Sequence, residues 1–77
     1  MITSENLLAL SRIINRISAV LTSYDITVSD FHDSWKISIF DGNCSVFSRV
    51  YSYDEVMREP DLLARHIIDE IAYGYTE

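Results

Sequence analysis

A chain of 77 residues buries only about 60% of its unfolded surface, which is enough for one modest core and too little for two ordinary domains or a deep, walled enzyme pocket. Apolar residues make up 48% and only two glycines and one proline occur, a composition typical of a folded domain and not of a disordered chain. Six Lys and Arg against twelve Asp and Glu give a net charge of −6, which disfavours direct binding to nucleic acid or to anionic membranes.

The first element is an amphipathic helix over about 4–22. Apolar residues recur there at alternating spacings of three and four, the period of one helical face. Thr3 or Ser4 can cap its start. The apolar stripe expected to face the core consists of Leu7, Leu10, Ile14, Ile17 and Leu21, flanked by Ile13 and Val20.

From Tyr24 the apolar period changes to two, which predicts strands. The first strand covers about 24–29, the second runs from Trp35 to Asp41-Gly42, and the third covers about 43–51. Asp-Gly between alternating apolar residues is a strong hairpin signal. A two-residue turn at Asp41-Gly42 predicts a register that sets Ile39 against Cys44, Ile37 against Val46 and Trp35 against Ser48 on the core face. The outer face then carries Lys36, Ser38, Ser45, Phe47 and Arg49.

Ser52 and Glu55 form a capping box that starts a short helix over 53–58. Pro60 is favoured at the first position of a helix, so a second helix begins there, and Gly74 is placed to end it. The predicted fold is one α+β domain over 1–77, in the order helix, three-stranded antiparallel meander, short helix and helix, with the helices packed on one sheet face.

The acidity is concentrated in two segments. Residues 25–33 carry three carboxylates, whereas residues 51–77 carry seven against two arginines. We expect these segments to bind a partner protein, although a solvated face that serves solubility is the alternative. Tyr73 and Tyr75 either cap the edge of the core or anchor that partner. The candidate partner-binding residues are Asp30, Asp33, Asp54, Glu55, Glu59, Asp61, Asp69, Glu70, Tyr73 and Tyr75.

No motif indicates catalysis, a cofactor or a metal. His66 and Glu70 share a helical face, but zinc needs three or four ligands. Cys44 is predicted on the core face as an inert hydrophobe, and as the sole cysteine it excludes an internal disulfide and fits a reducing compartment. No apolar run approaches the roughly 20 residues of a membrane span, and Glu5 stands where a signal peptide carries a basic residue. We therefore expect a cytoplasmic, non-enzymatic protein.

The order helix, three strands, helix also occurs in the double-stranded RNA-binding domain. That family carries basic residues where its last helix begins, whereas this chain has Glu59 and Asp61 there, so RNA binding is not expected. In size, acidity and element order the chain resembles small phage-encoded inhibitors, including anti-CRISPR proteins. The resemblance implies a stoichiometric blocker of a basic, nucleic-acid-binding site on a host protein, acting in the host cytoplasm. The alternative is a homo-oligomeric structural or regulatory domain without inhibitor activity.

Overall fold

A computed structural model describes residues 3–74 and contains three helices and one sheet. Helix α1 covers Ser4–Val20, and the Thr3 side chain caps it by accepting a hydrogen bond from the Asn6 N–H at 3.1 Å. Strands β1 (Asp25–Phe31), β2 (Ser34–Asp41) and β3 (Cys44–Ser52) form an antiparallel meander in the order β1-β2-β3. Helices α2 (Tyr53–Arg58) and α3 (Pro60–Tyr73) complete the chain, and Gly74 follows α3 in a left-handed conformation.

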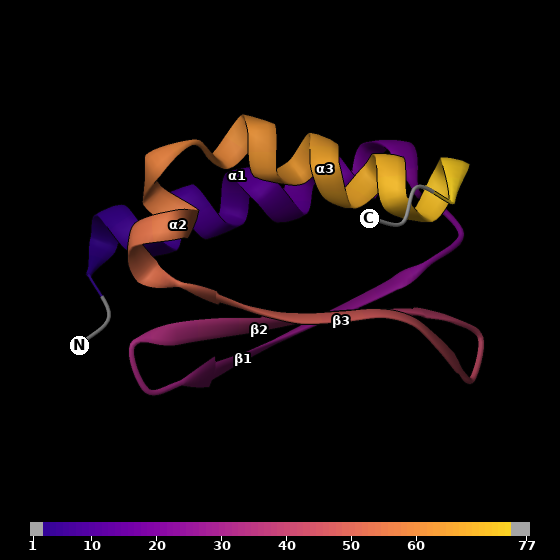
Figure 1. The fold of residues 1–77 in the computed structure, drawn as a ribbon, viewed down its shortest axis with the longest axis horizontal. Helices are drawn as coiled ribbons and strands as arrows, with labels where there is room; N and C mark the ends of the chain where they lie inside the picture. The colour runs from indigo at the N-terminus through magenta and orange to yellow at the C-terminus, as the bar shows by residue number, and fades with distance from the viewer. Residues whose placement is uncertain (1–2, 75–77) are drawn as a thin grey trace.

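The molecule has two layers. The helices lie together on one side of the sheet, α1 beside α3, and α2 leads from the end of β3 into α3 (Figure 1). The predicted α+β arrangement, with all helices on one sheet face, is confirmed.

The core fills the space between these layers. Its completely buried apolar side chains come from α1, β2, α2 and α3, and burying each isoleucine or valine among them stabilises the fold by about 1.5–3 kcal/mol. They are Ile13, Ile17, Ile37, Ile39, Val56, Ala64 and Ile67.

The predicted core stripe of α1 was correct at Leu10, Ile17 and Leu21 and wrong at Leu7. Leu7 is 46% exposed and Val20 is 57% exposed, whereas Asn6 is only 1% exposed. The helix is rotated so that Asn6, Leu10, Ile13 and Ile17 face the core. The reason is a hydrogen bond. The Asn6 side chain accepts from the buried indole N–H of Trp35, so its amide faces the core although it is polar.

The predicted register between β2 and β3 was also wrong. Asp41 pairs with Cys44, so the turn consists of Gly42 and Asn43, and Gly42 has φ 65° at the first central position, as a type II′ turn requires. The pairing then shifts at a β-bulge near Ile39 and Phe40, after which Ile39 pairs with Phe47 and Ile37 with Arg49. The bulge inserts one extra residue, Val46, into β3 and so reverses the predicted faces of the residues that follow it.

The turn and the bulge together correct four predicted positions. Phe47, predicted on the outer face, is buried at 5% exposure, whereas Val46, predicted in the core, is 44% exposed. Cys44, also predicted in the core, is exposed. Arg49, predicted on the outer face, shares a row with Ile37 and its guanidinium reaches Glu70 of α3.

Candidate functional site

Two acidic segments that are distant in sequence meet at one end of the molecule. The β1–β2 turn packs against the start of α2, where the Tyr53 N–H donates to the Asp33 carbonyl oxygen at 3.0 Å. The Tyr53 hydroxyl donates to Asp30 Oδ1 at 2.6 Å. Asp54 and Glu55 follow in the first turn of α2. We call the four carboxylates Asp30, Asp33, Asp54 and Glu55 the acidic end.

The backbone beneath the acidic end is fixed from both sides. The Ser52 hydroxyl accepts from the Glu55 N–H at 3.1 Å and Glu55 Oε1 accepts from the Ser52 N–H at 2.9 Å, which confirms the predicted capping box. The acidic first turn is also favoured by the positive end of the helix dipole. In the β1–β2 turn, His32 adopts a positive φ of 57°, which lets the chain reverse within two residues.

A buried polar network connects this end to the core. The Trp35 indole N–H donates to Asn6 Oδ1, and Asn6 Nδ2 donates to the Tyr53 carbonyl oxygen at 3.4 Å. The Trp35 and Tyr53 rings lie 5.6 Å apart. Asn6 thus joins α1, β2 and the start of α2, so the position of Tyr53 and its carboxylate partner is set by groups in the core.

The titration of Tyr53 reports the electrostatics of the acidic end. The hydrogen bond to Asp30 raises the pKa of Tyr53 to about 12, with smaller contributions from desolvation and from the negative charges of Asp30 and Asp33. Both carboxylates disfavour the phenolate because it would add a third negative charge. The hydroxyl therefore remains a donor throughout the physiological range.

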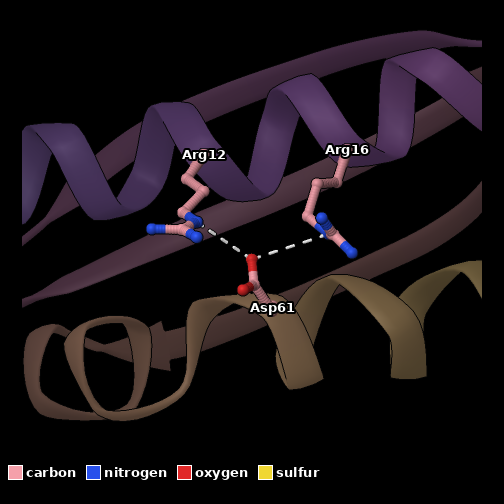
Figure 2. Close-up of polar contacts among 3 residues, drawn as sticks. All are labelled: Arg12, Arg16 and Asp61. Atoms are coloured by element: carbon pink, nitrogen blue, oxygen red, sulfur yellow. Dashed lines mark hydrogen bonds and ion pairs between the residues drawn. The ribbon is translucent and has the colours of Figure 1, made fainter.

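Two other candidate carboxylates form ion pairs between neighbouring elements. Asp61 Oδ1 lies 3.0 Å from Arg12 Nε and 3.5 Å from Arg16 Nε, so one carboxylate of α3 bridges two arginines of α1 (Figure 2). Glu70 Oε1 lies 3.2 Å from Arg49 Nη2 and connects α3 to β3. These ion pairs are solvent-exposed, and such pairs contribute about 0–1 kcal/mol each.

The remaining candidates are dispersed over the helical layer. Glu59 is exposed between α2 and α3, Asp69 is half-buried on α3, and Tyr73 is 70% exposed near the end of α3. Tyr75 lies outside the described residues. The structure thus brings together the carboxylates around Tyr53, and it does not join all the candidates into one surface.

A groove between α1 and α3 was not predicted from the sequence. It encloses about 520 Å³ and is lined by Arg16, Ala19, Val20, Asp61, Leu62, Arg65 and Ile68. Arg16 and Arg65 line the groove together with Asp61, and the neighbouring Arg12 also pairs with Asp61. The groove is therefore locally basic on an acidic protein. Its sequence signal is the spacing of Arg12 and Arg16, which places both on one face of α1.

Within residues 3–74, no three His, Cys, Asp or Glu side chains are grouped as metal ligands would be. The described helices include none with the length and apolar character needed to cross a membrane. No known protein family, curated protein or solved structure matches this chain.

Proposed function

We propose that the protein is a small acidic binding domain that acts as a stoichiometric, phage-type inhibitor and blocks a basic, nucleic-acid-binding site on a host protein such as a CRISPR effector. The observation that supports this proposal is the acidic end, where carboxylates from two separate segments gather at the start of α2 and one of them, Asp30, is bound by Tyr53.

The acidic end presents negatively charged oxygen acceptors to a basic groove, as a nucleic-acid backbone does. Carboxylate oxygens accept the forked N–H groups of arginine, as phosphate oxygens do. The carboxylates of Asp30 and Glu55 are held by hydrogen bonds from Tyr53 and Ser52, so little side-chain freedom remains to be lost on binding. A negative end on a chain of net charge −6 also accelerates encounter with a basic surface, and this acceleration decreases as salt screens the charges.

The test compares two variants of equal net charge. Asp30→Asn with Asp54→Asn removes two charges from the acidic end and keeps an oxygen acceptor for the Tyr53 hydroxyl. Glu59→Gln with Asp69→Asn removes two charges elsewhere. Each protein is immobilised, exposed to host lysate, and eluted with duplex DNA, and eluted proteins are identified by mass spectrometry.

We expect DNA to elute a basic nucleic-acid-binding protein from the parent and from the Glu59/Asp69 variant. The purified partner should bind the acidic-end variant about tenfold more weakly or worse, as loss of interfacial charge pairs implies. Equal weakening of both variants would show that net charge alone attracts the partner. A partner that stays bound to the immobilised protein when duplex DNA is added would refute the occupation of a nucleic-acid-binding site.

A further inference from the structure

The sheet face opposite the helices is covered by no other element within residues 3–74 (Figure 1). The register places its side chains in rows across the three strands. The central row is Thr27, Ser38 and Ser48, where the two serine hydroxyls lie 3.2 Å apart. We call this surface the open face. Its outer rows are Ser29, Lys36 and Val50 on one side and Asp25, Phe40 and Ser45 on the other.

The open face differs from the rest of the molecule in charge. Lys36 and Asp25 are the charged residues of these three rows and they cancel, on a chain whose net charge is −6. Two copies repel each other when acidic surfaces meet. The open face is therefore a broad surface on which a second copy meets no net repulsion, and its central row of small hydroxyls allows close approach.

The rows are also self-complementary. A two-fold axis along the Thr27–Ser38–Ser48 row places the row of Lys36 over the row of Asp25 and Phe40 in the other copy. Lys36 then lies opposite the partner copy's Phe40 ring and is offset sideways by one strand spacing, about 4.8 Å, from the partner copy's Asp25. The same operation repeats both contacts, as an isologous interface requires.

We propose that the open face is a homodimer interface, in which two copies of the sheet stack face to face about this axis and Lys36 of each copy pairs with Asp25 of the other. Face-to-face sheets pack about 10 Å apart with their strands rotated by about 30°, a distance that the long side chain of Lys36 can bridge. The acidic end, which lies where α2 begins, remains accessible in this dimer. The dimer does not depend on the proposed inhibitor function.

The size of the face is that of a weak interface. Strands of seven, eight and nine residues span about 26 Å by 14 Å, which corresponds to total buried accessible surface on the order of 1,000 Å². That area lies at the lower limit for a specific interface. The dimer should therefore form reversibly and in a concentration-dependent manner.

The mass is measured by sedimentation equilibrium and by size exclusion with light scattering. Protein concentrations run from about 10 µM to 1 mM, a range matched to a weak dimer. We expect the mass to rise towards twice 8.9 kDa. Lys36→Glu and Asp25→Lys should each weaken the dimer about tenfold or more, because each places like charges together. The double variant should restore the dimer, because the swapped pair has opposite charges again.

Ser48→Glu tests the axis separately, since a residue on the axis meets its own copy and a carboxylate there repels itself. The control is Leu8→Glu with Leu62→Glu, which adds charge at exposed apolar positions of the helical layer and should leave dimerisation unchanged. Circular dichroism confirms that each variant is folded. A mass of 8.9 kDa at every concentration overturns the proposal, as does a double swap that fails to restore the dimer. Loss of the dimer in the control variant would place self-association at the helices and would also overturn it.

Discussion

Replacing Asn6 with leucine should destabilise the fold, although it puts an apolar side chain at a position that is 1% exposed. The substitution conserves volume approximately but removes the acceptor of the Trp35 indole N–H and the donor to the Tyr53 carbonyl. A buried polar group left without a partner costs about 1–3 kcal/mol. A loss of about 2 kcal/mol would lower the Tm of a domain this small by roughly 8–16 °C.

A double-mutant cycle separates this bond from packing. Trp35→Phe removes the donor, so Asn6→Leu should cost less in the Trp35→Phe background than in the parent, with a coupling free energy of about 1 kcal/mol. Urea unfolding followed by far-ultraviolet circular dichroism measures each free energy, because the variant lacks the single tryptophan needed for fluorescence. Costs that add within about 0.3–0.5 kcal/mol would show no coupling and refute the role assigned to Asn6.

Three further outcomes follow from the fold. Cys44 is exposed, so a maleimide should label it in the native protein as fast as in urea. Labelling only after unfolding would contradict its exposed position beside the hairpin turn. Tyr53 should ionise near pH 12. Its titration is the difference between the absorbance titrations of the parent and of Tyr53→Phe, and Asp30→Asn should lower the pKa of Tyr53. Because the folded state holds this proton more tightly, the stabilisation is fully present below the unfolded pKa of about 10 and is lost as pH rises towards 12. Gly42→Ala should cost about 1 kcal/mol, since φ is 65° but a Cβ would meet nothing within 4 Å; a urea-derived cost above about 3 kcal/mol would indicate a clash.

Local signals in the sequence sufficed for the elements and their order. The capping box of Ser52 and Glu55, Pro60 at the start of α3 and Gly74 after its end each lie where these residue types predict a boundary. Such signals depend on backbone groups within a few residues, so a single sequence contains them in full. The arrangement of layers follows because each predicted element has one apolar face to bury.

The errors arose where a distant partner decides the outcome. A bulge in β3 is stabilised by placing Phe47 and Tyr51 under the helices, and nothing local at Val46 indicates it. The buried amide of Asn6 likewise depends on Trp35, which lies 29 residues away. Asn6 lies four positions before Leu10, which is the spacing of the observed core stripe. This spacing was the one available signal, and it indicates a buried amide only once Trp35 is known to be its partner.

The carboxylates have two separate roles, and this division determines which substitutions test binding. Reversing the charge of Asp61 would place a cation against Arg12 and Arg16, and reversing Glu70 would do the same at Arg49. Either change alters the contacts of α3 with its neighbours, so a loss of binding would not identify an interface. The Asp30 and Asp54 side chains form none of these ion pairs among the described residues. Neutralising them removes charge from the acidic end while the helices keep their ion pairs, so a loss of binding in that variant can be assigned to the acidic end itself.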